Sequence, residues 1–135
     1  MKTIVVLTVE DSDAFAHAMA LAIEEAGLPV RLFRALDGEE AIHFLRHEDG
    51  FNDSPVPDLV FLDLNLPRLT GFDVLAEMRH DLRLRSIPTV VLTSSSSPSD
   101  CAKSLALGAN EYILKPTDFE RLMAAVSGAC ERYAH

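Results

Sequence analysis

Five short apolar runs, separated by segments with helical spacing, constrain the fold of this chain most strongly. The runs cover residues 3–9, 30–35, 58–63, 88–93 and 111–115. Between and after them, apolar residues recur at intervals of three and four, as they do in amphipathic helices. Strands that alternate with helices predict a parallel sheet covered on both faces, because each connection must cross back to the same edge. We therefore expect an α/β fold with five strands and five helices.

Four of the five expected helices have one apolar stripe, and the strands differ in how completely they are apolar. The stripes are Phe15, Met19, Ala22 and Ile23 before Gly27; Ala41, Ile42 and Leu45 after a predicted N-cap at Asp37; Phe72, Leu75 and Met78; and Phe119, Leu122, Met123, Val126, Cys130 and Tyr133. The fourth helix is expected to be short and to end at Gly108. Continuous apolar runs suit central strands, whereas the alternating run 30–35 suits an edge. A polar loop is expected at 48–57, and residues 1–135 read as one domain.

Composition excludes several classes of function. The formal net charge is −9, from 21 acidic and 12 basic residues, which disfavours direct binding to nucleic acid or an anionic membrane. No stretch is long enough to span a bilayer, and the apolar start is followed by EDSD instead of a cleavage site, so we expect a cytoplasmic protein. Cys101 and Cys130 lack metal-ligand spacing and are expected in the core or in grooves. The histidines are expected at the surface and not as metal ligands; they are His17, His43, His47, His80 and His135.

Polar residues follow four of the predicted strands at the point where each strand ends. Glu10 and Asp11 follow the first strand, Asp63 ends the third, Thr93 ends the fourth and Lys115 ends the fifth. In a parallel sheet these ends share one edge, where ligands of open α/β sheets bind. Three carboxylates, a hydroxyl and an amine are therefore expected to converge.

That combination of groups favours metal-assisted phosphoryl chemistry. Clustered carboxylates repel one another and offer an all-oxygen ligand set, which suits Mg²⁺. A carboxylate can also attack phosphorus to form an aspartyl-phosphate, and Asp63 is the candidate. The ammonium of Lys115 and the hydroxyl of Thr93 could then stabilise the phosphoryl oxygens.

The motifs together resemble the response-regulator receiver domain of two-component signalling. VVLTVEDSD, ALDGEEAI, FLDLNLPRLTGFDVL, VVLTSS and LGANEYILKP each resemble a segment of that family, and the resemblance covers essentially the whole chain. It implies a flavodoxin-like, CheY-like fold with five parallel strands in the order 2-1-3-4-5 and helices on both faces. It also implies a signalling protein that catalyses its own phosphorylation and dephosphorylation.

The resemblance assigns the metal and the phosphoryl group to particular residues. It implies that Asp63 accepts the phosphoryl group and that Lys115 pairs with it. Mg²⁺ would be bound by Asp11, by Asp63 and by the backbone carbonyl of Asn65, with Glu10 acting through water.

The resemblance also implies a switch. Thr93 would turn toward the phosphoryl group, and the ring of Tyr112 would move inward behind it. Asn65 and Ser95 lie at the positions that tune the lifetime of the phosphoryl group in this family.

The partners implied are a sensor histidine kinase and a downstream protein. The loop RHEDGFNDSPVPDLV and the phrase LGANEYILKP resemble the small receivers that partner bacterial and cyanobacterial phytochromes, so the kinase could be a phytochrome. The output would be a protein contact or onward transfer to a phosphotransfer protein.

Three other functions fit parts of the pattern. A Mg²⁺-dependent phosphohydrolase also uses a strand-end aspartate, but it needs a second aspartate where this chain has Asn65. A flavodoxin-like nucleotide binder would want a glycine- or hydroxyl-rich loop after the first strand, where VEDSD would repel phosphate. An adaptor that works without phosphorylation leaves the intact acidic set and Lys115 without a purpose.

The sequence finally suggests a homodimer through residues 99–133. This segment contains Tyr112 and mixes apolar with charged side chains, as expected of a symmetric contact in which each opposite-charge pair occurs twice. The residues concerned are Lys103, Leu107, Glu111, Glu120, Arg121 and Met123.

Overall fold

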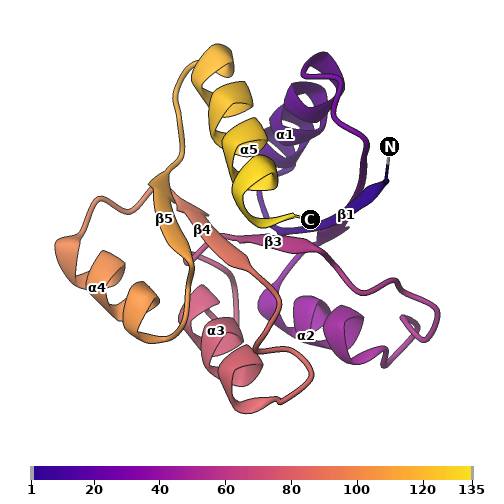
Figure 1. Ribbon diagram of the computed structural model, residues 1–135. Helices are drawn as coiled ribbons and strands as arrows, with labels where there is room; N and C mark the ends of the chain where they lie inside the picture. Colours follow the sequence, from indigo (N-terminus) through magenta and orange to yellow (C-terminus); the bar gives the residue numbers. More distant parts are fainter. Residues whose placement is uncertain (1, 135) are drawn as a thin grey trace.

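A five-stranded parallel sheet with the strand order β2-β1-β3-β4-β5 forms the centre of the structure, a computed structural model that describes residues 2–134 (Figure 1). The elements are β1 (Ile4–Val9), α1 (Asp13–Glu25), β2 (Val30–Ala35), α2 (Gly38–Arg46), β3 (Leu59–Leu62), α3 (Gly71–His80), β4 (Thr89–Thr93), α4 (Pro98–Ala106), β5 (Glu111–Leu114) and α5 (Phe119–Tyr133). The predicted fold class and strand order are therefore confirmed.

The continuous apolar runs form the interior of the sheet. β1, β3 and β4 lie between other strands, and every residue of β3 and β4 is buried. The alternating run forms β2, which pairs only with β1 and lies at an edge, as predicted. Strands covered on both faces need apolar side chains in both directions, which explains the contrast.

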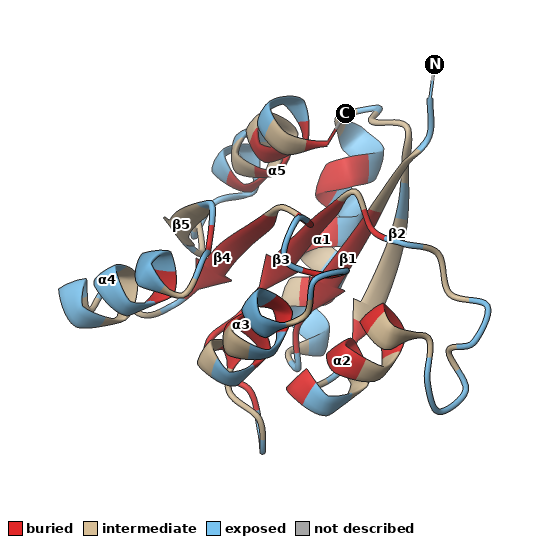
Figure 2. Cartoon of the chain, turned by 60° about the horizontal axis from the view of Figure 1, so that its bottom comes forward, coloured by how far each residue is buried: buried red, intermediate tan, exposed pale blue. Residues whose placement is uncertain are grey.

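Successive side chains of each central strand enter two separate cores. Val6, Phe61 and Val90 pack with α1 and α5 on one face of the sheet. Leu7, Leu62 and Val91 pack with α2 and α3 on the other. Figure 2 shows the buried strands between these two layers. This alternation fixes the register of the sheet, because a slip by one residue would exchange the two sets of side chains.

A side chain caps the N-terminus of each of the five helices. Asp37 accepts a hydrogen bond from the Glu40 amide at 2.8 Å, as predicted. Thr70 and Asp73 form a reciprocal capping box at the start of α3. These caps satisfy amide groups that have no partner within the helix.

One of the predicted stripe positions, Phe119, is wrong, and two others, Phe15 and Phe72, pack against the cores only at their borders. Phe119 is 39% exposed, because it is the first residue of α5, which begins beyond the end of β5 (Figure 1). Phe15 and Phe72 are only partly buried, while the smaller Ala16 and Val74 are buried against the sheet. The large aromatic rings lie at the borders of the helix contacts, and small residues occupy their centres.

The expectation of surface histidines holds for His17 and His80 but not for His43 and His47. The loop after α2 folds back over that helix, so that His43 lies 3.2 Å from Asp49 and His47 is hydrogen-bonded to Ser54 at 3.0 Å. The prediction for His135 lies outside the described residues. Cys130 is buried and Cys101 partly buried, as expected. No helix within residues 2–134 is long and apolar enough to cross a membrane.

Candidate functional site

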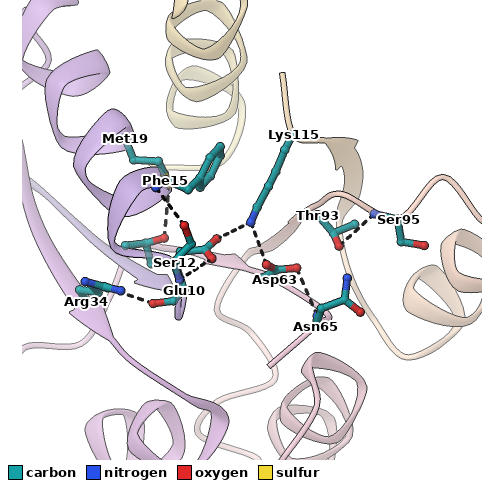
Figure 3. A network of polar contacts seen from close by, with 11 residues as sticks. Glu10, Ser12, Phe15, Met19, Arg34, Asp63, Asn65, Thr93, Ser95 and Lys115 are labelled. Atoms are coloured by element: carbon teal, nitrogen blue, oxygen red, sulfur yellow. Dashed lines mark hydrogen bonds and ion pairs between the residues drawn. The ribbon is translucent and has the colours of Figure 1, made fainter. Parts of the chain in front are cut away.

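The predicted site residues lie together where the carboxyl ends of the strands meet. Glu10 and Asp63 are buried and Asp11 is exposed, and one carboxylate oxygen from each lies within 4.8 Å of the others. Figure 3 shows Lys115 and Thr93 beside this group. The parallel register produces the cluster, since β1, β3, β4 and β5 all end here.

Lys115 bridges the two buried carboxylates. Its Nζ atom lies 2.9 Å from Oε1 of Glu10 and 2.9 Å from Oδ2 of Asp63 (Figure 3). The ammonium also lies 4.4 Å from the centre of the Phe15 ring, within range of a cation–π contact. An ammonium in this position compensates two negative charges that burial would otherwise make costly.

The pKa values of the bridge reflect burial and pairing. Burial raises the pKa of Glu10, and the nearby charge of Asp63 adds to the rise, while Lys115 and the Ser12 amide oppose it. Burial would lower the pKa of Lys115, but its hydrogen bonds to Asp63 and Glu10 outweigh that effect and raise it. Lys115 therefore stays charged, whereas Glu10 takes up a proton more readily than an exposed glutamate would.

Backbone contacts hold the two carboxylates in place. The Asn65 amide donates to Oδ1 of Asp63 at 3.2 Å, and the Ser12 amide donates to Oε2 of Glu10 at 3.1 Å. Arg34 donates from Nε to the Glu10 carbonyl at 2.9 Å. Both buried acids are thus positioned from the strand end and from the following loop.

A glycine allows α3 to begin against the strand end. A Cβ atom at Gly71 would overlap the carbonyl oxygen of Asp63 and would lie 2.7 Å from Cα of Leu64. The Gly71 amide donates to the Leu64 carbonyl at 3.0 Å in the same contact. Any larger residue would push the helix away from the Asp63 loop.

Thr93 and Tyr112 meet at the loop after β4. The Ser95 amide donates to Oγ1 of Thr93 at 3.4 Å, and the Tyr112 hydroxyl donates to the Ser95 carbonyl at 2.7 Å. The Ser95 hydroxyl donates to Oδ2 of Asp100 on α4 at 2.6 Å. The two predicted switch residues are thus linked through Ser95, and Ser95 links them to α4.

The acidic cluster fits a divalent cation. Glu10, Asp11 and Asp63 offer three carboxylate oxygens close enough to share one ion, and hard cations such as Mg²⁺ prefer oxygen ligands. The exposure of Asp11 leaves the cluster open to solvent on one side. An open side suits Mg²⁺, which keeps several waters when it binds.

Comparison with known proteins identifies the family. The family model of the response regulator receiver domain matches residues 6–127. This chain belongs to the response regulator receiver family. The match includes all the residues that the sequence placed at the site, from Glu10 to Lys115.

Two curated relatives resemble the receiver domain over most of their length. A probable methanogenesis regulatory protein, FilR2 of Methanothrix harundinacea, is 38% identical over 90% of this chain and 78% of its own. The response regulator Rcp1 of Synechocystis is 36% identical over 92% of this chain and 84% of its own.

Solved structures of response regulators, one of them a phytochrome response regulator, share the fold. The phosphorylated cyanobacterial phytochrome response regulator RcpA is 35% identical, with a TM-score of 0.91 over 98% of this chain and 94% of its own. The Mn²⁺-bound form of Rcp1 is 35% identical, with a TM-score of 0.85 over 94% and 91%. The predicted similarity to phytochrome-associated receivers is confirmed.

Sequence reasoning missed several contributors to the site. Phe15 was assigned only to the core, although its ring lies against the Lys115 ammonium. Arg34 was assigned only to the edge strand, although it binds the Glu10 carbonyl. Neither contact has a local signal, because each joins residues that are distant in sequence. The cap at Ser12 follows a pattern that was available: a serine just before a helical stripe.

Proposed function

We propose that residues 1–135 act as a single receiver domain that accepts a phosphoryl group on Asp63 from the phosphohistidine of a sensor kinase. The observation that carries the proposal is the placement of the Asp63 carboxylate between the Lys115 ammonium, at 2.9 Å, and two further carboxylates. A buried carboxylate at the edge of a parallel sheet, next to a cation and a potential metal site, is arranged to meet an anionic phosphoryl group.

Transfer joins an oxygen of Asp63 to phosphorus and breaks the phosphorus–nitrogen bond of the donor imidazole. The departing imidazole nitrogen keeps the electron pair of that bond and takes up a proton. Mg²⁺, when bound by Asp11, Asp63 and the Asn65 carbonyl, neutralises charge on the phosphoryl oxygens. Lys115 binds the phosphoryl group, and its contact with Glu10 weakens as it does so. The same site would catalyse hydrolysis later, with water as the nucleophile.

The chain's own residues favour this function over its alternatives. A phosphohydrolase would need a carboxyl group where Asn65 supplies an amide, which cannot serve as acid or base. A nucleotide binder would need free amides after β1, but Glu10 already accepts from the Ser12 amide there. We place the protein in the cytoplasm, where a sensor kinase of the phytochrome type would reach it; the similarity to the phytochrome response regulator RcpA supports a kinase of this type.

Phosphorylation is tested by incubation with Mg²⁺ and acetyl phosphate, followed by intact-mass measurement. One acid-stable, base-labile phosphoryl group is expected per chain. Asp63→Asn should abolish it, because an amide is a poor nucleophile, whereas the exposed control Asp53→Asn should be labelled like the parent. Labelling that persists in Asp63→Asn would place the acceptor elsewhere and refute the proposal.

The output surface is proposed to be residues 99–133, switched through Thr93 and Tyr112 and used for a homodimer or a downstream protein. The link from Thr93 through Ser95 to α4 supports this location. Glu111 is held within the chain by Arg132 at 2.8 Å and by Tyr133 at 2.9 Å, so it is a poor choice for charge reversal. Glu120 and Arg121 are exposed and better suited.

Light scattering on the apo protein, and on the protein with Mg²⁺ and beryllofluoride, tests the dimer. A larger mass with the phosphoryl mimic is expected, and Thr93→Ala should stay folded but lose the change. A monomer at tens of micromolar in both states would contradict the dimer while leaving phosphoryl transfer to Asp63 untouched.

A further inference from the structure

A cavity lies near the amino-terminal end of β4, where α3 ends, whereas Asp63 lies at the carboxyl ends of the strands. It has a volume of about 430 Å³ and lies between the end of α3, the segment that leads into β4, and the end of α4. Figure 1 shows α3 and α4 on the same side of the sheet, next to β4 and β5. The lining residues are Leu75, Met78, Arg79, Leu84, Arg85, Ser86, Ile87, Thr89, Leu107 and Gly108.

The cavity has an apolar floor, and its remaining lining is polar or basic. Leu75, Met78 and Leu84 belong to the core that forms the floor. Arg79 and Arg85 are exposed at the border. No acidic residue lines the cavity within residues 2–134, although the chain has 21 acidic residues against 12 basic ones. A volume of this size is within the range of small-molecule sites.

The two arginines at the mouth are available for a ligand. In the part of the chain that the structure describes, the side chains of Arg79 and Arg85 have no hydrogen bond or ion pair. Two acids close to them in sequence are already engaged, because Arg46 binds Glu77 at 2.7 Å and lies 3.5 Å from Asp81.

Glycine at the end of α4 keeps one of these arginines at the cavity. A Cβ atom at Gly108 would lie 3.1 Å from an Nη atom of Arg79 and 3.3 Å from its Cδ. Gly108 has a φ of +105°, which side-chain-bearing residues rarely adopt. The Arg79 side chain therefore lies flat across the end of α4, with its guanidinium at the border of the cavity.

We propose that this cavity binds a small organic oxyanion, a carboxylate or phosphate group carried on a flat apolar body. The apolar body would lie on the leucine and methionine side chains, and the anionic head would be held by Arg79 and Arg85. A guanidinium matches both head groups, because it can donate two parallel hydrogen bonds to either. The Ser86 hydroxyl lies at the same cavity and offers a further donor.

The proposal is tested by titrating ¹⁵N-labelled protein with 2-naphthoate, 1-naphthyl phosphate and the uncharged 2-naphthamide. Saturable amide shifts are expected for residues 75–89 and 107–108, with a dissociation constant on the order of a millimolar or tighter for at least one anion. The two anions distinguish a carboxylate from a phosphate ligand. The amide should bind about tenfold more weakly, because it lacks the charge-assisted hydrogen bonds.

Matched variants separate this site from general charge effects. Arg79→Gln/Arg85→Gln should weaken anion binding about tenfold or more, whereas Arg68→Gln/Arg121→Gln, with the same change in net charge at exposed positions, should bind like the parent. Ser86→Trp should block the cavity while both arginines remain. Asp63→Asn should leave anion binding unchanged, because Asp63 lies at the carboxyl ends of the strands and the cavity lies at the amino-terminal end of β4.

Three results would overturn the proposal. The first is the absence of saturable shifts with both anions. The second is equal affinity for the amide and the anions. The third is unchanged anion binding in Arg79→Gln/Arg85→Gln or in Ser86→Trp, as judged against the Arg68→Gln/Arg121→Gln control. None of these results bears on phosphorylation of Asp63, which is measured separately.

Discussion

Replacing Lys115 by methionine tests whether its ammonium holds two buried carboxylates in the unphosphorylated protein. The Lys115 side chain is 14% exposed, and those of Glu10 and Asp63 are 3% and 5% exposed, so water screens the group little. Methionine keeps much of the apolar stem, which limits the change largely to the loss of the charge. Removing one partner of a buried ion pair typically costs about 3–5 kcal/mol.

The loss of stability in Lys115→Met should depend on pH, because Glu10 can respond to the missing ammonium by taking up a proton. The pKa of Glu10 is already raised by burial, and the loss of the ammonium raises it further. A carboxyl with a raised pKa stabilises the fold below its unfolded pKa, and that stability is lost as pH rises through the folded value. We therefore expect Lys115→Met to be less stable than the parent by about 3 kcal/mol at pH 8 without metal, and by clearly less at pH 5.

Urea unfolding followed by far-ultraviolet circular dichroism measures the difference, since the chain has no tryptophan. Mg²⁺ should reduce the difference in free energy of unfolding between the parent and Lys115→Met at pH 8. A cation that binds only the native state adds about 2.7 kcal/mol to the free energy of unfolding at a hundredfold excess over its dissociation constant.

Lys103→Met is the matched control for this experiment. Lys103 contacts the Phe72 ring at 4.2 Å and is exposed, so its loss should cost about 1 kcal/mol or less at either pH. If Lys115→Met matched the parent at pH 8 without metal, or if its deficit ignored both pH and Mg²⁺, the bridging role of Lys115 would be wrong.

Three further results are expected. Burial raises the pKa of the Cys130 thiol to about 11, so at pH 8 a disulfide reagent should modify Cys101 at once and Cys130 only after unfolding. Gly71→Ala should lower the urea midpoint and slow phosphorylation, because its Cβ would overlap the backbone at Asp63, the proposed phosphoacceptor; a parent-like variant would contradict this contact. Tyr112→Phe should speed amide exchange at Ser95 and its neighbours without changing the melting temperature by more than a few degrees, since it removes one partly buried hydrogen bond.

The fold could be predicted closely because its signals are local and repeated. The continuous apolar runs marked β1, β3 and β4 as central, and the alternating run marked β2 as an edge. Asp37 was identified as a cap because aspartate before an apolar stripe is a typical helix start. The error at Phe119 has a simple cause: helical spacing identifies a face, but it does not say where along the helix the sheet ends.

The site could be predicted as a set of residues but not as a set of contacts. Parallel strands made the convergence of Glu10, Asp63 and Lys115 predictable, because their strand ends must share one edge. The bridge by Lys115, with 2.9 Å contacts to both acids, depends on the loop after β5 and could not be read from spacing. The cavity at Arg79 and Arg85 was missed for a similar reason, since α4 closes it from a distant part of the chain.

The bridge also connects the stability of the domain with its proposed switch. Without phosphate, the Lys115 ammonium is shared between Glu10 and Asp63. Phosphorylation would convert the Asp63 carboxylate into an acyl phosphate whose negative charge lies on the phosphoryl oxygens, farther from the strand. Lys115 should then follow that charge, and Glu10 would lose part of its compensation unless a metal ion replaces it. On this reasoning Mg²⁺ contributes more to the stability of the phosphorylated form than to that of the unphosphorylated form. In the phosphorylated form the ion must neutralise the Glu10 carboxylate, because Lys115 has moved away from it.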